Sequence, residues 1–108
     1  MRKTRTMALA GVAAMVLGGA AAQAEDSGPV TAGKGVAQLW CVNCHVVSTA
    51  QTSGSDQAPT WQGIADRPGM TAERLHNFLE KPHGKMPDFK LGDTDIDNVA
   101  AYILSLKH

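Results

Sequence analysis

The sequence has few aromatic residues, only two cysteines and no excess of charge of either sign. Five of its 108 residues are aromatic, and ten basic residues balance ten acidic ones. It contains no basic stripe and no basic–aromatic run, so nothing indicates binding to nucleic acid. No repeat and no alternating strand pattern is found either. The chain is therefore predicted to be one small, helical domain.

The start of the chain is predicted to be a secretory signal peptide. Three basic residues occur within the first five positions, and a stretch rich in Ala, Gly and Val follows at 7–22. Small residues at 22 and 24 then complete the pattern of a cleavage site. We expect cleavage after about Ala24, export to the periplasm and no stable membrane insertion afterwards. The alternative is a retained anchor, for which the apolar stretch is short.

The remaining segment, 25–108, is predicted to be a single domain with a thin core. Removing 24 of the 108 residues leaves 84, with seven basic and ten acidic side chains and a formal charge of −3. A chain of this size has a high ratio of surface to volume, and it usually needs a disulfide, a metal or another staple. The two cysteines indicate where that staple is.

Three segments have apolar residues at helical spacing, and three others are rich in Gly, Pro or small polar residues. The predicted helices are 32–43, Thr71 to about Glu80, and Thr94 to about Leu106, with the two threonines as N-caps. The predicted loops are 25–31, 48–58 and 82–92.

The two cysteines lie in the pentapeptide Cys41-Val42-Asn43-Cys44-His45, a CxxCH motif that is typical of c-type haem attachment. Two thiols on one helical turn can both form thioethers with the porphyrin vinyl groups. His45 then falls under the iron and supplies one axial ligand. A thioredoxin-like site would need a preceding strand, and a zinc site would need a fourth ligand. A disulfide across so small a loop would stabilise little. We therefore predict one covalently bound haem c.

The second axial ligand decides the function, because an open site binds small molecules and a filled site transfers electrons. Methionine is typical of electron-transfer cytochromes and raises the reduction potential. Met86 lies in a loop rich in Gly and Pro, and it is favoured as the ligand. Met70 precedes a helix and is expected in the core. His83 is the alternative ligand, whereas His76 and His108 are not expected to bind iron.

These features together resemble a class I cytochrome c, over nearly all of 25–108. The residues that carry the resemblance are Gly33, the motif at 41–45, Pro59, Met86-Pro87, Val99 and Tyr102. The resemblance implies an all-α, small cytochrome c fold, in which three main helices wrap around one covalently attached haem.

The resemblance also implies roles for single residues. His45 and Met86 correspond to the axial ligands, which are the metal-binding residues. Pro59 corresponds to a proline whose carbonyl binds the other ring nitrogen of that histidine and fixes its orientation. Gly33 and Tyr102 correspond to the small and aromatic residues at the crossing of the first and last helices.

One position departs from the family. The residue four positions before the first haem cysteine is often aromatic in the family, and here it is Ala37. Trp40, next to Cys41, is a candidate for the missing bulk.

The expected function is that of a periplasmic single-electron carrier with one His/Met-ligated haem c, and not that of an enzyme. Its expected partners are redox proteins that dock transiently, such as a dehydrogenase, an oxidase or a reductase, and the chain is expected to be a monomer. One alternative is an electron-accepting haem subunit of a periplasmic dehydrogenase complex. The other is a haem peroxidase or gas-binding protein, for which only His83 could act beside an open site.

Overall fold

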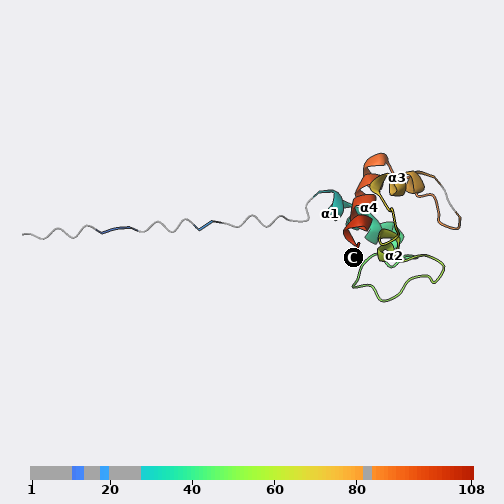
Figure 1. Cartoon of the computed structure of the whole chain (residues 1–108), viewed down its shortest axis with the longest axis horizontal. Coiled ribbons are helices and arrows are strands. Elements are labelled where there is room, and N and C mark those ends of the chain that lie inside the picture. The colour runs from blue at the N-terminus through green and yellow to red at the C-terminus, as the bar shows by residue number, and fades with distance from the viewer. Residues whose placement is uncertain (1–10, 14–17, 20–27, 82–83) are drawn as a thin grey trace, which may run out of the picture.

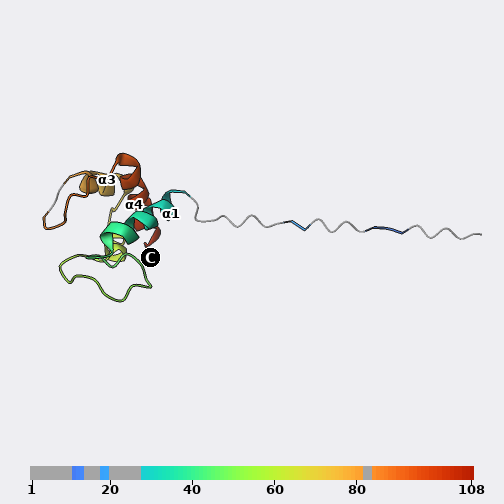
Figure 2. The same ribbon diagram turned by 180° about the vertical axis from the view of Figure 1, so that it is seen from behind.

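The chain folds into helices that are joined by two long loops (Figures 1 and 2). The computed structural model describes residues 11–13, 18–19, 28–81 and 84–108. The elements are α1 (Pro29–Val36), the π-helical turn η1 (Ala37–Cys41), α2 (Trp61–Ala65), α3 (Ala72–Glu80) and α4 (Asp93–Ser105). These ranges contain no strand, so the predicted all-α class is confirmed.

Most of the predicted signal peptide, 1–24, lies outside the described residues, and its cleavage stays a prediction. Within the part of the chain that the structure describes, no helix has the length and apolar character needed to cross a membrane.

The first helix begins three residues earlier than predicted. Gly28 has a φ of 112° and precedes Pro29, which occupies the first helical position. Proline suits this position because its φ is already helical and it has no N–H to leave unpaired. The predicted loop at 25–31 is therefore wrong for its last three residues, and 25–27 lie outside the described ones. The helical path continues through η1 and ends at Cys41.

Helix α1 crosses α4 at very short range, as both views show (Figures 1 and 2). Gly33 is buried at the crossing. A Cβ atom at this position would lie 2.9 Å from the Cβ of Tyr102 and would overlap the backbone carbonyl of Asn98. The predicted contact between Gly33 and Tyr102 is confirmed, and the missing side chain is what allows the two backbones to approach.

The core lies where α4 meets α1, α2 and α3. The buried residues of α4 are Ile96, Val99, Ala100, Tyr102 and Ile103. Leu106 is only partly buried because it follows the end of the helix. Met70 packs against the core, as expected. Eleven hydrophobic residues of the described ranges are buried, and three of them are alanines, so the core is thin.

The sequence predicted the N-cap of α3 correctly and that of α4 incorrectly. The Thr71 hydroxyl accepts the backbone N–H of Arg74 at 3.2 Å, which confirms it as the cap of α3. For α4 the predicted cap, Thr94, is wrong, because the helix begins at Asp93 with Gly92 as its cap. The two aspartates of the first turn stabilise the positive end of this helix without a side-chain cap.

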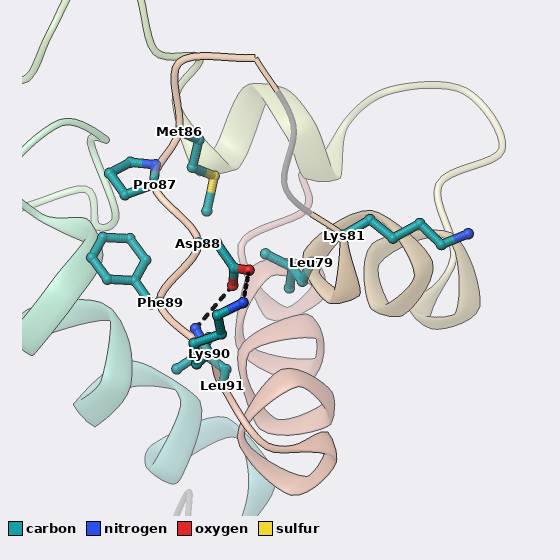
Figure 3. A pocket seen from close by; sticks show the side chains of 8 residues that line it. All are labelled: Leu79, Lys81, Met86, Pro87, Asp88, Phe89, Lys90 and Leu91. Carbon is teal, nitrogen blue, oxygen red and sulfur yellow. Dashed lines mark hydrogen bonds and ion pairs between the residues drawn. The ribbon is translucent and has the colours of Figure 1, made fainter.

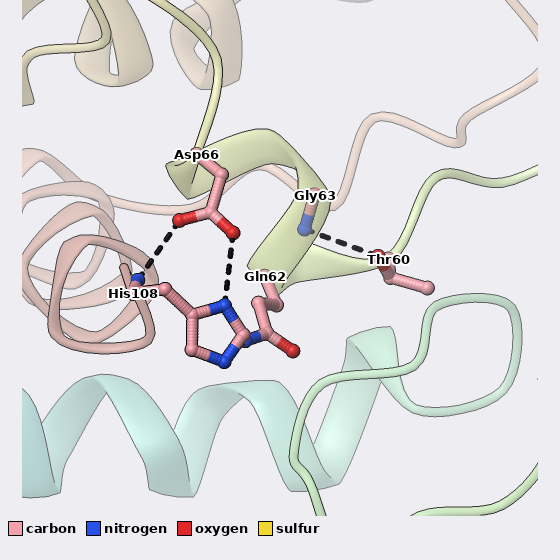
Figure 4. Close-up of polar contacts among 5 residues, drawn as sticks. All are labelled: Thr60, Gln62, Gly63, Asp66 and His108. Atoms are coloured by element: carbon pink, nitrogen blue, oxygen red, sulfur yellow. Dashed lines mark hydrogen bonds and ion pairs between the residues drawn. The ribbon is translucent and has the colours of Figure 1, made fainter.

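The short helix α2 was not predicted. The Thr60 hydroxyl caps it by accepting the backbone N–H of Gly63 at 3.1 Å (Figure 4). A threonine before apolar residues was an available signal, but a helix of five residues is too short for a periodic pattern to appear.

The last residue of the chain is tied to α2 (Figure 4). The Asp66 carboxylate accepts the backbone N–H of His108 at 2.9 Å, and it lies 3.2 Å from the His108 ring. The Gln62 side chain also contacts this ring. His108 therefore contacts both α2, through Gln62, and Asp66, the residue that follows this helix.

Helices α3 and α4 are joined by an exposed pair of side chains. The Nδ1 atom of His76 lies 2.7 Å from the Oδ1 atom of Asp97. The hydrogen bond to Asp97 raises the pKa of His76 above its usual value of 6.5, and the negative charges of Asp97, Glu80 and Asp93 add to this effect. The pair thus favours the protonated imidazole.

We expect this pair to contribute to stability only at low pH. Because the pKa of His76 is higher in the folded chain than in the unfolded one, its contribution is complete below pH 6.5. It is then lost as the pH rises through the native pKa. The effect should be small because the pair is exposed. Urea unfolding of the haem-bound protein at about pH 6 and pH 9 measures the contribution of the pair to the free energy of unfolding. An NMR titration measures the pKa of His76. Asp97→Asn should reduce the pH difference and lower the pKa of His76; an unchanged pKa would contradict this assignment.

Candidate haem-binding site

The CxxCH motif begins where η1 ends. The Val42 N–H donates to the Ala37 carbonyl at 3.0 Å, the spacing of a π-helical turn. The amides of Cys44 and His45 then both lie within hydrogen-bond distance of the Cys41 carbonyl, at 3.2 and 2.9 Å. This turn keeps both thiols and the imidazole close together along the backbone.

The two cysteines are not joined by a disulfide, and they lie in different environments. Cys41 is buried, whereas Cys44 is exposed. Burial raises the pKa of the Cys41 thiol to about 11, which favours an uncharged sulfur over a thiolate. A thioether sulfur is also uncharged, whereas a zinc ligand must be a thiolate. The environment of Cys41 therefore fits a thioether bond to a porphyrin.

The zinc alternative also lacks the necessary geometry. Throughout the described ranges, the one cluster of three possible metal ligands consists of His76, Glu80 and Asp93, whose atoms lie within 4.8 Å of one another. It lies on α3 and α4 and does not include the motif. The three motif side chains do not form such a cluster, and zinc would require a fourth ligand as well.

The imidazole of His45 is held by a hydrogen bond from outside the motif. Its Nδ1 atom lies 2.6 Å from the backbone carbonyl oxygen of Pro59. Because a carbonyl only accepts, Nδ1 carries the proton and the lone pair is on Nε2, the form in which histidine binds a metal. The hydrogen bond implied by the family resemblance is thus present, and the binding of iron by Nε2 stays a prediction.

A chain of aromatic rings connects His45 to the helix crossing. Trp61 is buried, and its ring centroid lies 6.0 Å from that of His45. On its other side, the edge-on ring of Tyr102 has its centroid at 5.9 Å. The Tyr102 hydroxyl donates to the Val47 carbonyl at 2.6 Å. The segment after the motif is therefore fixed directly to α4.

Met86 lies in the loop between α3 and α4, where its side chain is half-buried. Figure 3 shows its thioether pointing into a small pocket. The lining residues are Leu79, Lys81, Met86, Pro87, Asp88, Phe89, Lys90 and Leu91. The Asp88 carboxylate stabilises the loop by two contacts with Lys90. It lies 2.8 Å from the Lys90 ammonium and accepts the backbone N–H of Lys90 at 3.0 Å.

The structure brings Pro59 to His45, and it places Met86 in a separate loop. The assignment of Met86 as the second axial ligand therefore stays a prediction. The alternative ligand, His83, lies outside the described residues.

Trp40 does not supply the bulk that Ala37 lacks. Ala37 is completely buried, whereas Trp40 is 52% exposed and packs against Phe89, with 5.8 Å between ring centroids. The expectation for Trp40 was wrong, because its ring packs on Phe89 and lies outside the buried core that contains Ala37. Trp40 instead links the turn before Cys41 to the loop that carries Met86.

Sequence reasoning missed Gln51, which lies in the predicted polar loop at 48–58. Its side chain is within hydrogen-bond distance of four backbone groups in and around the motif. No local signal distinguishes it from the other polar residues of the loop, since its partners are defined by the folded chain.

Comparison with known proteins agrees with the site. Residues 28–103 match the family described as cytochrome c oxidase, cbb3-type, subunit III. Cytochrome c-552 of Bradyrhizobium diazoefficiens is 40% identical over 96 residues, which cover 89% of each chain. No solved structure gives a significant match. The chain therefore belongs to the cbb3-type subunit III family of c-type cytochrome domains, and it is an electron-transfer protein with covalently bound haem c.

Proposed function

We propose that the chain is an exported single-electron carrier, in which Cys41 and Cys44 attach one haem c and His45 and Met86 are its axial ligands. The observation that carries this proposal is the CxxCH turn, with two cysteines that form no disulfide and an imidazole whose Nδ1 donates to the Pro59 carbonyl. The iron of haem c supplies the redox couple, cycling between the ferrous and ferric states.

Each of these residues then has one task. The cysteines tether the cofactor, and His45 presents Nε2 to the metal. The Pro59 carbonyl fixes the ring orientation and increases the basicity of the imidazole. The Met86 thioether fills the remaining position, which favours the reduced state and excludes small ligands. With His45 and Met86 both bound to it, the iron would gain or lose an electron without a change of ligand.

We expect Met86→Ala to convert the carrier into an open haem protein. Ferric protein should lose the absorption band of the iron–methionine bond near the red edge of the visible spectrum, and reduced protein should bind carbon monoxide. The midpoint potential should fall, because methionine ligation raises it. Visible spectroscopy and redox titration of the purified holoprotein measure these changes.

Met70→Ala is the matched control, since Met70 packs against the core. It should keep the band and should not bind carbon monoxide. Loss of the band in Met70→Ala, with its retention in Met86→Ala, would reverse the assignment. A pyridine haemochrome assay measures the haem content of both variants, so that their absorption bands can be compared per haem.

We further propose that the carrier works in the periplasm. The support is the order of basic, apolar and small residues in 1–24, which is typical of a cleaved export signal.

We propose that the chain acts as a monomer and docks transiently with a dehydrogenase, an oxidase or a reductase. This proposal is supported by the similar lengths of this chain and cytochrome c-552, which is itself a small protein. The second candidate is a stable subunit of a larger redox complex, because the matched family is named after an oxidase subunit. Size-exclusion chromatography of native extract distinguishes a small carrier from a complex.

A further inference from the structure

We propose that Gln51 is a positioning residue, which fixes the backbone of the haem motif and thereby the orientation of the His45 imidazole. The inference rests on the proposed function, in which His45 binds the iron.

The carboxamide of Gln51 makes contacts in two directions. Its Oε1 atom accepts the backbone N–H of Val47 at 2.9 Å. Its Nε2 atom lies 2.8 Å from the carbonyl oxygens of both His45 and Ser53, and 3.3 Å from that of Val42. An amide nitrogen has two hydrogens, so His45 and Ser53 are the main acceptors and Val42 shares a weaker contact.

These contacts matter because the chain has no helix or strand directly after the motif. The backbone N–H and C=O groups of this segment must therefore be paired by individual hydrogen bonds, and not by those of a helix or sheet. The Ser55 N–H donates to the Cys44 carbonyl at 2.7 Å, and the Trp61 N–H donates to the Val46 carbonyl at 3.0 Å. Gln51 provides the partners for Val42, His45 and the Val47 amide.

His45 is consequently held at two points. Pro59 binds its ring through Nδ1, and Gln51 binds its backbone carbonyl. A hydrogen bond to the ring alone leaves the main chain able to shift. With the backbone also fixed, the plane of the imidazole is determined by the protein, as for other metal ligands that are oriented by groups around them.

On its other side Gln51 lines a cavity of about 270 Å³. The remaining lining residues are Val46, Ser48, Thr49, Thr60, Gln62 and Leu106. Truncating Gln51 would extend this cavity toward the motif, and water could then reach the exposed carbonyls. Water can replace the hydrogen bonds, but it cannot connect the motif to the loop. The main loss should be in the positioning of His45.

The test compares haem-bound wild type with Gln51→Ala, Gln51→Glu and Gln62→Ala. The NMR shifts of the haem methyl groups in ferric protein report the orientation of the axial imidazole, and redox titration gives the midpoint potential. Gln51→Ala should change the pattern of methyl shifts, and the ratio of ferrous to ferric protein at a fixed applied potential should differ from that of wild type. Gln51→Glu should not restore the wild-type pattern, because a carboxylate can accept from Val47 but cannot donate to the carbonyls.

Gln62→Ala is the matched control, since Gln62 lines the same cavity but its side chain contacts His108. It should keep the wild-type pattern and potential. A wild-type pattern in Gln51→Ala, with the haem content intact, would overturn the positioning role while leaving the proposed function standing. Wild-type protein without haem c or histidine ligation would instead overturn the proposed function.

A measurement on wild type alone covers the case in which the variants fail to mature. Hydrogen exchange of the Val47 amide and of the Gln51 carboxamide should be slow, and that of the Gln62 carboxamide should be faster. Rapid exchange at both Val47 and Gln51 would overturn the proposal.

Discussion

Replacing Cys41 and Cys44 together with alanine should give a colourless chain without covalent haem. The two sulfurs are the proposed points of attachment, and no other cysteine occurs in the sequence. The loss should therefore be complete. Pyridine haemochrome analysis after acid–acetone extraction measures covalently bound haem, because extraction removes haem that is not bound by thioethers.

The same double variant should also lose cooperative unfolding. Across the described residues only eleven hydrophobic residues are buried, three of them alanines, so the protein part of the core is small. A domain of this size depends on a staple for its stability. Thermal unfolding followed by circular dichroism should show a broad, weak transition in place of a sharp one.

Single variants and a matched control separate attachment from general damage. Cys41→Ala and Cys44→Ala should each retain one thioether, and thus some covalent haem with a shifted haemochrome band. Asn43→Ala changes an exposed residue between the two cysteines and leaves the CxxCH pattern intact, so it should keep its full haem content. Covalent haem in the double alanine variant would refute the attachment.

The sequence predicted well those features that depend on neighbouring residues. The CxxCH spacing is a local property, and so is the Thr71 cap, which acts on a backbone N–H three positions away. The contact between Gly33 and Tyr102 is long-range, and so is the hydrogen bond that His45 donates to the Pro59 carbonyl. Both were accessible only through the family resemblance.

The features that the sequence did not reveal are set by tertiary contacts. Thr94 has the residue type of a cap, but the helix begins one position before it. Trp40 lies beside Cys41 in sequence, yet it packs on Phe89 from the opposite half of the chain. Gln51 is one of several polar residues in a loop until folding places the motif carbonyls around its side chain.

Gly33→Ala should be among the most destabilising single substitutions, because it forces apart the helices on which the site is built. The added Cβ would meet the backbone carbonyl of Asn98 and the Cβ of Tyr102. Neither atom is the end of a flexible side chain, so α1 must move as a whole. Overpacking of this kind costs about 3 kcal/mol at its upper range, which lowers Tm by roughly 15 °C in a domain of this size.

Gly35→Ala provides a sharp control for this prediction, because Gly35 lies on the same helix and no atom would come within 4 Å of its Cβ. Alanine favours helix over glycine by about 1 kcal/mol, so Gly35→Ala should stabilise the haem-bound protein slightly. The same gain acts at Gly33, and only the clash with α4 reverses its sign. Urea unfolding measures the free energy of unfolding of each variant. If Gly33→Ala were as stable as Gly35→Ala, the close crossing of α1 and α4 would not exist. The packing of Trp61 on Tyr102 of α4 would then not be fixed by that crossing.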